Sequence, residues 1–228
     1  MNIAFRVDAS LQIGTGHFVR CLTLADELSR FETAVRFVSR HMPSHFRDLL
    51  RDRGYEFADV GGVPASAATG AGDHAPWLGT TQAGDAAGTI LALSDRAWDW
   101  LVVDHYALDA EWEGRLRPSV RGILIIDDIA DRRHDCDILL DQNRFADMET
   151  RYAGKVPPHC QLLLGPRYAL LRREFSRLRA CLEPRSGAVR RVLIFCGGVD
   201  AENVTETAVE ALAGLRGSGA TNGGTWSK

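Results

Sequence analysis

The residues with the clearest chemical potential stand near the start of the chain, in the tetrapeptide GTGH that ends at His17. A histidine can take up a proton near neutral pH, so an imidazole on a ligand-facing turn is suited to general-base chemistry. Gly14 and Gly16 allow a ligand to approach the backbone more closely than a side chain would permit. By spacing alone, a capping or surface role for His17 is the commoner alternative.

The familiar phosphate-binding and metal-binding patterns do not fit this chain. The first turn lacks the GxxxxGK[ST] loop, and Val19 stands where the third glycine of GxGxxG would fall. Asp127 and Asp128 form a carboxylate pair, but because no third ligand is in view we favour a loop-shaping role for them. His41 and His45 are four residues apart beside a proline, which does not make a convincing zinc pair. We therefore predict no metal site.

Short apolar runs rich in β-branched residues predict the strands that position these side chains. The runs lie at residues 2–7, 34–39, 100–105, 122–127, 137–143, 161–166 and 191–197. Continuous runs of this kind suit strands that are buried on both faces of a parallel sheet. Helical patterns are clearest at about 17–30, 43–53 and 200–214. The chain is thus predicted to adopt an α/β fold, in which ligands collect at the carboxyl ends of the strands.

The composition excludes several classes of function. A net charge of −3 over 228 residues gives no basic footprint for a nucleic acid. No apolar run approaches the ~18 residues of a membrane span, and the N-terminus is unlike a secretory signal, so we expect a cytoplasmic protein without membrane contact. The five cysteines form no CxxC pair, which favours reduced structural thiols over a zinc site or a disulfide framework.

Breaks in composition indicate the domain organisation. We expect an N-terminal domain over residues 1–182, a linker at 183–190, the start of a second α/β domain at 191–215 and an unstructured tail at 216–228. Within the first domain, the stretch from residue 61 to about 90 is rich in Gly, Ala and Thr. This composition predicts a mobile surface loop or an insertion.

Several segments in the same order resemble the PseG family of nucleotide-sugar hydrolases. They are FRVDASLQIGTGHFVRCLTLADEL at 5–28, DHYALD at 104–109, IIDDIADRRHDCDILLDQN at 125–143, LLLGPRYALLRREF at 162–175 and VLIFCGGVDAENVT at 192–205. The resemblance runs from residue 2 to about 214, apart from the 61–90 stretch. It implies a GT-B-type architecture like that of the glycosyltransferase MurG. This chain would then hold a Rossmann-like N-terminal domain and only the start of the second Rossmann-like domain.

The resemblance also implies an activity, with the residues that carry it. Enzymes of this family remove UDP from UDP-2,4-diacetamido-2,4,6-trideoxy-β-L-altropyranose in pseudaminic acid biosynthesis, by attack of water at C1 with inversion. By this resemblance His17 is the general base, Tyr106 contacts substrate near the attacked carbon, and no metal or other cofactor is needed. Further substrate contacts are expected from Asp8, Ser10, Gln12, Gly16, Asn143 and Tyr168, and UDP contacts from Gly197, Gly198 and Asp200.

Structural roles remain as alternatives for several of these residues. Asp8 could equally satisfy backbone N–H groups of its own turn, and Tyr106 could pack against the helix that follows it. Asn143 and Tyr168 are as readily structural as ligand-binding. A UDP-sugar is the partner molecule that we expect, and protein partners cannot be predicted from the sequence.

Two departures from the family pattern bear on activity. Val199 stands where the family has the hydroxyl of a Gly-Gly-Ser-Asp or Gly-Gly-Thr-Asp turn, which removes one hydrogen bond to the diphosphate. The second domain also stops after one predicted strand and helix, although the family continues with the units that hold uridine. We therefore expect a truncated hydrolase with weak or no turnover. The alternatives are a MurG-like glycosyltransferase and a non-catalytic N-terminal domain.

Overall fold

The computed structural model describes residues 1–61, 74–183, 187, 189, 191–196, 200 and 203–213. The chain divides into two compact units, Met1–Cys181 and Leu182–Lys228. The larger unit holds all of the strands that are described, and the second holds one described helix, α6, over Val204–Ala213.

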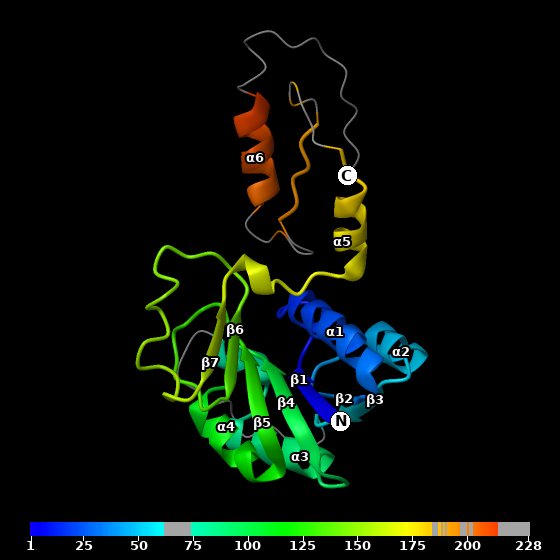
Figure 1. Cartoon of the computed structure of the whole chain (residues 1–228), viewed down its shortest axis with the longest axis vertical. Coiled ribbons are helices and arrows are strands. Elements are labelled where there is room, and N and C mark those ends of the chain that lie inside the picture. Colours follow the sequence, from blue (N-terminus) through cyan, green and yellow to red (C-terminus); the bar gives the residue numbers. More distant parts are fainter. Residues whose placement is uncertain are drawn as a thin grey trace. The chain divides into compact units, whose positions relative to one another are not determined.

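A seven-stranded parallel sheet forms the centre of the larger unit (Figure 1). Its strands are β1 Asn2–Val7, β2 Ala34–Ser39, β3 Glu56–Asp59, β4 Trp98–Asp104, β5 Val120–Ile126, β6 Ile138–Asp141 and β7 Gln161–Leu164. The strand order is β3-β2-β1-β4-β5-β6-β7, and every neighbouring pair is parallel. The order therefore reverses between β1 and β4, as in a Rossmann-like fold. The predicted α/β class and its parallel sheet are confirmed.

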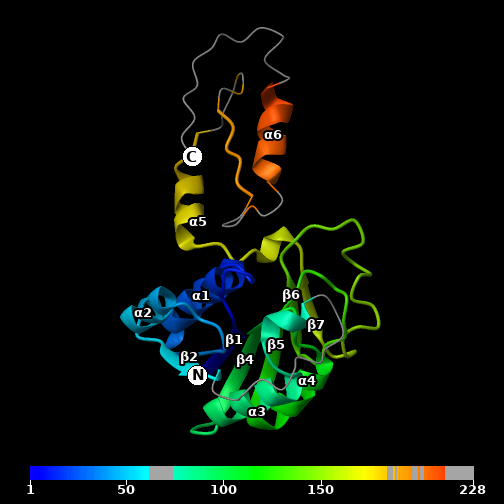
Figure 2. The same cartoon turned by 180° about the vertical axis from the view of Figure 1, so that it is seen from behind.

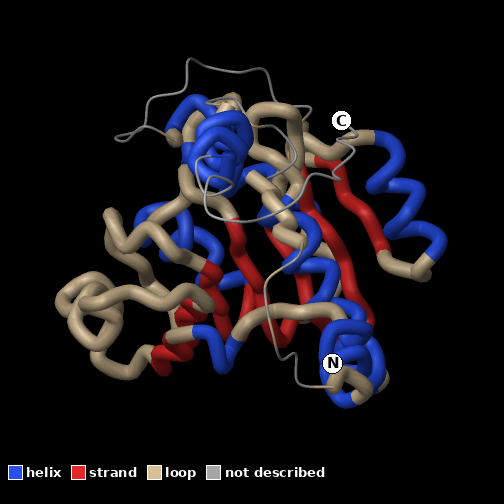
Figure 3. The backbone as a smooth tube through the Cα atoms, turned by 90° about the horizontal axis from the view of Figure 1, so that it is seen from above, coloured by secondary structure: helices blue, strands red, loops and turns tan. Residues whose placement is uncertain are grey.

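Helices cover both faces of this sheet (Figures 2 and 3). On one face, α1 Gly16–Leu28 and α2 Ser44–Asp52 pack with Phe5 and Phe37 of the strands. On the other, α3 Gln82–Ala92 and α4 Ala110–Leu116 pack with a second apolar cluster. That cluster contains Leu101, Ile123, Leu139, Trp98 and Trp112. These two layers bury the apolar strands on both sides, as the continuous runs in the sequence require.

The connections on the β5-β6-β7 side of the sheet are loops. Residues 127–137 and 142–160, which join these strands, are all described and contain no helix. A further helix, α5, follows β7 at Arg173–Ala180. None of the helices among the described residues is long and apolar enough to span a membrane.

The expectation of a loop from residue 61 to about 90 is wrong in its second half, where α3 begins at Gln82. The hydroxyl of Thr81 accepts a hydrogen bond from the Gly84 N–H at 3.1 Å and caps this helix. Its small residues allow close packing, since a Cβ on Gly88 would lie only 3.3 Å from Cβ of Val60. The small residues that suggested a loop thus allow α3 to pack closely against Val60, which follows β3. Residues 62–73 lie outside the described part of the chain.

The strand predicted at 191–197 is not present in its described residues, 191–196. Its backbone pairs with none of the described strands, and an extended segment without a neighbour has no ladder of hydrogen bonds. Leu193 is 91% exposed and Phe195 80% exposed, so the apolar run that suggested a buried strand is not buried. The helix predicted after it does form, as α6.

Gly122 on β5 offers a direct test of the packing within the sheet. It lies opposite Trp100 of β4, and a Cβ at this position would come within 2.8–3.0 Å of three atoms of the indole ring. Gly122→Ala should therefore lower the free energy of unfolding by about 1–3 kcal/mol, measured by urea denaturation, because the ring has to move.

Gly114→Ala is the matched control for this change. Gly114 lies inside α4, and its new methyl group would meet only a carboxylate oxygen of Asp135 at an ordinary 3.9 Å. Since alanine favours a helix over glycine by up to about 1 kcal/mol, this variant should be unchanged or slightly more stable. Equal destabilisation of both variants would contradict the close contact at Gly122.

Candidate active site

Polar side chains gather at the carboxyl ends of β1 and β4, where the strand order reverses. Asp104 is the last residue of β4, and His17 lies in the first turn of α1, which follows the loop after β1. In open α/β sheets this switch point is the usual place for a ligand. The fold thus brings together two residues that are 87 positions apart in the sequence.

Asp104 holds His17 and Arg20 in fixed positions. Its Oδ1 lies 2.6 Å from Nδ1 of His17, and its two oxygens accept hydrogen bonds from Nε and Nη2 of Arg20 at 2.5 and 2.7 Å. The carboxylate is fully buried, which opposes ionisation, but His17 and Arg20 outweigh the burial and hold the pKa of Asp104 well below its usual value. Asp104 is therefore ionised at neutral pH.

The ionised carboxylate fixes the tautomer of His17. A carboxylate can only accept hydrogen bonds, so Nδ1 of His17 must carry the proton that it donates to Asp104. In the neutral imidazole Nε2 then holds the lone pair, and Nε2 has no hydrogen-bond partner among the described residues. This geometry leaves one basic nitrogen free on a side chain that is otherwise buried and only 10% exposed. It is the arrangement that a general base requires.

Tyr106 and Asp128 extend this cluster towards the neighbouring strands. The ring of Tyr106 meets that of His17 edge-on, with centroids 4.6 Å apart, and its hydroxyl donates a hydrogen bond to Asp128. Burial and the Asp128 carboxylate raise the pKa of Tyr106, so the phenol stays protonated. Asp128 also accepts hydrogen bonds from Arg20 and from the exposed Asn143, each at 3.1 Å. The structure thus brings His17, Tyr106 and Asn143 of the predicted site residues into one group.

Asp8 is buried and hydrogen-bonds to none of the residues of this group. Its side chain is fully buried and accepts hydrogen bonds from the Arg6 guanidinium at 2.7 and 3.1 Å, from the Ser39 hydroxyl at 2.8 Å and from the Arg40 N–H at 2.8 Å. Burial opposes its ionisation, but Arg6 and His105 hold the pKa of Asp8 well below its usual value. This placement is at odds with the expected sugar contact, because the carboxylate is already saturated by protein donors. Asp8 thus ties the end of β1 to the end of β2, through Ser39 and Arg40.

The other predicted residues of the first loop lie near its surface. Ser10 accepts a hydrogen bond from the Ile13 N–H at 3.0 Å and bridges to Gly14, which closes the loop. Gln12 and Gly16 are exposed, and open space surrounds the position of a Cβ on Gly16. These residues leave the backbone at the start of α1 accessible to a ligand.

Four predicted site residues remain, Tyr168, Gly197, Gly198 and Asp200. Tyr168 is half-buried against the apolar cluster under α1. Gly197 and Gly198 lie outside the described residues. In the second unit, Asp200 accepts hydrogen bonds from the N–H groups of Val204 and Thr205 at 2.9 and 2.8 Å, so its carboxylate caps α6. Two of the N–H groups that could receive a phosphate are thereby engaged.

The carboxylate pair at 127–128 divides into two structural roles. Asp127 is buried and accepts hydrogen bonds from the Ala130 N–H at 2.9 Å and the Tyr152 hydroxyl at 3.2 Å. It shapes the loop after β5, as expected, while Asp128 faces Tyr106. In the described part of the chain, no three His, Cys, Asp or Glu side chains are arranged to hold a metal ion.

Arg20 is the main site residue that the sequence did not reveal. It stands three positions after His17, so the two side chains share one face of α1. Arg20 could have been predicted from this spacing of a histidine and an arginine, together with an aspartate that ends a later strand. Helices are rich in surface arginines, so the spacing alone had no meaning until β4 was placed beside β1.

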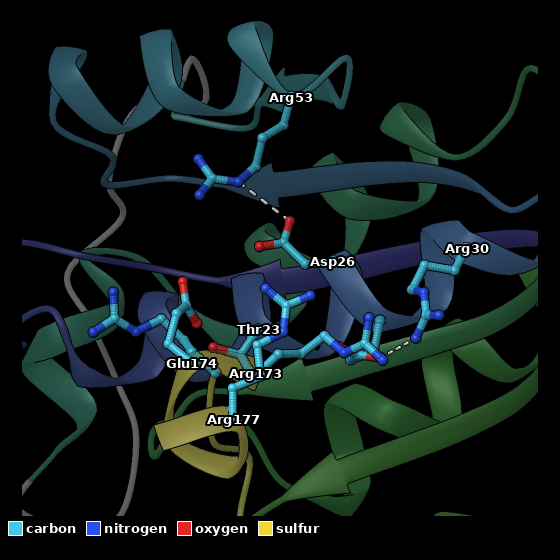
Figure 4. A pocket seen from close by; sticks show the side chains of 9 residues that line it. Thr23, Asp26, Arg30, Arg53, Arg173, Glu174 and Arg177 are labelled. Atoms are coloured by element: carbon cyan, nitrogen blue, oxygen red, sulfur yellow. Dashed lines mark hydrogen bonds and ion pairs between the residues drawn. The ribbon is translucent and has the colours of Figure 1, made fainter. Parts of the chain in front are cut away.

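A separate charged cavity of about 250 Å³ lies between α1 and α5 (Figure 4). It is lined by Thr23, Asp26, Glu27, Arg30, Arg53, Arg172, Arg173, Glu174 and Arg177. Ion pairs line it: Arg53 pairs with Asp26 at 3.2 Å, and Arg173 and Arg30 pair with Glu27 at 3.0 and 3.1 Å. None of its lining residues is a histidine or a member of the His17 group. The residues suited to proton transfer are those at the switch point.

The fold and site define a Rossmann-like α/β domain with an aspartate-held histidine at the switch point of its sheet. No family model matches the sequence. Over 209 residues the chain is 27% identical to the UDP-2,4-diacetamido-2,4,6-trideoxy-beta-L-altropyranose hydrolase of Campylobacter jejuni, covering 90% of this chain and 63% of that protein. The chain is a distant homologue of this hydrolase and spans about 63% of its length.

A solved structure is also similar in part. The crystal structure of Acinetobacter baumannii MurG matches with a TM-score of 0.42 and 11% sequence identity, over 72% of this chain and 44% of that one.

Proposed function

We propose that the chain acts on a UDP-sugar and hydrolyses the bond between its anomeric carbon and UDP. The observation that carries this proposal is the pairing of His17 with the ionised Asp104, which leaves Nε2 free at the switch point. Distant homology to a hydrolase of UDP-2,4-diacetamido-2,4,6-trideoxy-β-L-altropyranose supports the choice of substrate. The proposed role is a step of pseudaminic acid biosynthesis.

The proposed reaction is a single displacement at C1 of the sugar. Nε2 of His17 takes one proton from a water molecule while the water oxygen forms a bond to C1. The bond from C1 to the diphosphate oxygen breaks, its electron pair leaves with UDP, and the configuration at C1 inverts. UDP is a good leaving group, so the reaction needs little help from a general acid. Asp104 stabilises the imidazolium that forms, as an aspartate does behind other catalytic histidines.

The neighbouring residues have supporting roles in this proposal. Arg20 holds Asp104 from a second direction, so that the carboxylate cannot rotate away from His17. Tyr106 stays protonated and lies against the His17 ring, where its side chain contacts the sugar near C1. Gly16 and the exposed loop residues before it offer backbone and side-chain groups to the sugar. Contacts to UDP are proposed for Gly197, Gly198 and Asp200.

The test is UDP release from the UDP-sugar with no acceptor present. A coupled assay measures the UDP, and the free sugar is detected separately. We expect slow release above the rate without protein, with one free sugar formed for each UDP. Release that requires an added acceptor sugar would instead identify a glycosyltransferase. If the chain releases no UDP while its circular dichroism shows a folded α/β protein, the alternative of a non-catalytic domain is supported.

A further inference from the structure

Two aromatic side chains from the stretch between β3 and α3 pack against Tyr106. His74 directly precedes a 3-10 turn over Ala75–Leu78, and Trp77 lies within that turn. The ring centroid of Tyr106 lies 5.1 Å from that of His74 and 5.9 Å from that of Trp77, while His74 and Trp77 are 4.5 Å apart. We call His74, Trp77 and Tyr106 the aromatic wall, and it adjoins His17 through Tyr106.

The turn that carries this wall is anchored to the larger unit. Leu78 is 2% exposed and belongs to the apolar cluster on the α3 side of the sheet. The Trp77 N–H donates to the His74 carbonyl at 3.0 Å, which closes the turn. Gly79 ends it in the left-handed conformation, with φ of 67°, where a Cβ would come within 2.9 Å of the His41 ring. The rings are therefore held in place before any ligand arrives.

Trp77 differs from the core tryptophans in its exposure and its hydrogen bonding. Trp98 and Trp112 are at most 1% exposed, and their indole N–H groups donate to the Leu93 carbonyl at 2.9 Å and the Asp85 carboxylate at 3.0 Å. Trp77 and His74 are only half-buried. The indole N–H of Trp77 has no hydrogen-bond partner in the described part of the chain. Trp77 is therefore not a core tryptophan, and its N–H is not engaged by any described residue.

We propose that the aromatic wall binds the sugar of the substrate and selects sugars with apolar substituents. This inference rests on the proposed function, which places the anomeric carbon beside Nε2 of His17. Aromatic faces pack well on methyl and C–H groups, and a tryptophan keeps an N–H donor for a polar group at the edge of its ring. A deoxy sugar with acetamido groups presents both, since it has methyl groups and amide carbonyl oxygens.

The position of the wall favours the sugar over the uracil base as its ligand. Tyr106 of the wall packs against His17, with ring centroids 4.6 Å apart. The wall therefore lies next to the sugar carbon that is attacked in the proposed reaction. The base is separated from that carbon by the ribose and the diphosphate. A ring that stacked on uracil would therefore lie well away from the general base.

The experiment compares Trp77→Phe and Trp77→Ala with the unchanged chain. Tryptophan fluorescence is followed while UDP-2,4-diacetamido-2,4,6-trideoxy-β-L-altropyranose or UDP alone is added, so that binding is read without turnover. The matched control is Trp100→Phe, which changes another half-buried tryptophan, near the amino end of the central strand β4. Thermal unfolding of each variant, followed by circular dichroism, separates loss of the fold from loss of binding.

We expect the UDP-sugar to change the fluorescence more than UDP does, and this extra change should be absent in Trp77→Phe but present in Trp100→Phe. In the UDP-release assay, Trp77→Ala should raise KM about tenfold with kcat altered less than about threefold, and Trp77→Phe should restore much of the loss. A response to the sugar that is unchanged in Trp77→Phe, or an equal response to UDP alone, overturns the inference.

The outcomes separate this inference from the proposed function. Hydrolysis with no Trp77-dependent response would leave the hydrolase standing and remove the aromatic wall as its sugar site. A Trp77-dependent response to the sugar without hydrolysis would support the wall and contradict the proposed function.

Discussion

Asp85→Ala should lower the free energy of unfolding by about 3–5 kcal/mol, because it removes one partner of a buried ion pair. Asp85 is fully buried on α3, and its carboxylate accepts hydrogen bonds from Nε and Nη2 of Arg6 at 3.0 and 2.6 Å and from the indole N–H of Trp112 at 3.0 Å. Without it, the buried guanidinium of Arg6 on β1 keeps Asp8 as its one charged partner among the described residues. Urea denaturation measures the loss.

Asp95→Asn is the matched control, since Asp95 also pairs with two arginines, Arg36 and Arg96, but on the surface. Solvent screens such pairs, so this variant should unfold at nearly the same urea concentration as the unchanged chain. If Asp85→Ala were no less stable than Asp95→Asn, the buried network would not be what holds α3 to the sheet. Should the alanine variant fail to fold, Asp85→Asn keeps the volume of the side chain and permits the same comparison.

The contribution of Asp85 should also depend on pH in a defined direction. Burial opposes ionisation of this carboxyl, but the Arg6 guanidinium outweighs it and holds the pKa of Asp85 below its usual value. A lowered pKa in the folded state stabilises the protein fully above the unfolded-state pKa, near 3.9, and this stabilisation is lost as pH falls through the folded value. The difference in stability between the unchanged chain and Asp85→Ala should therefore shrink as the pH falls below about 4.

The sheet could be predicted from the sequence because its signal is local. β1 and β2 begin and end where the apolar runs at 2–7 and 34–39 do, since strands buried on both faces need continuous apolar residues. The two wrong predictions, the loop up to about residue 90 and the strand at 191–197, concern segments whose structure depends on tertiary contacts. α3 depends on a buried ion pair and on close packing of Gly88, neither of which appears in local composition. The run at 191–197 has the composition of a strand but no described partner strand.

The site could be predicted only in part, for a related reason. His17 and Tyr106 each follow a strand whose carboxyl end faces the switch point, so sequence and strand order together bring them to one place. Asp8 follows a strand in the same way, yet its side chain points to the side of the sheet that holds Arg6 and Asp85. Strand position predicts the edge of the sheet, whereas the direction of a side chain depends on what packs against each face.

His17→Ala should reduce UDP release by about 10²–10⁴-fold, the usual contribution of a positioned general base. The change should leave the fold intact, because Asp104 retains both hydrogen bonds from Arg20 when the imidazole is removed. His17→Asn is a stricter variant, since an amide can still donate to Asp104 but cannot take up a proton at neutral pH. Initial rates of UDP release, measured at saturating substrate, give the comparison.

The matched control is His159→Asn, which alters a histidine whose side chain is 60% exposed and pairs with Asp137 at 3.4 Å, outside the His17 group. It should release UDP at the rate of the unchanged chain. If both His17 variants kept that rate while remaining folded, the base would have to lie elsewhere. If only His17→Ala lost activity, the hydrogen bond to Asp104 rather than proton transfer would be the contribution of this residue. Loss in both variants, with His159→Asn unaffected, is the result that a base held by Asp104 requires.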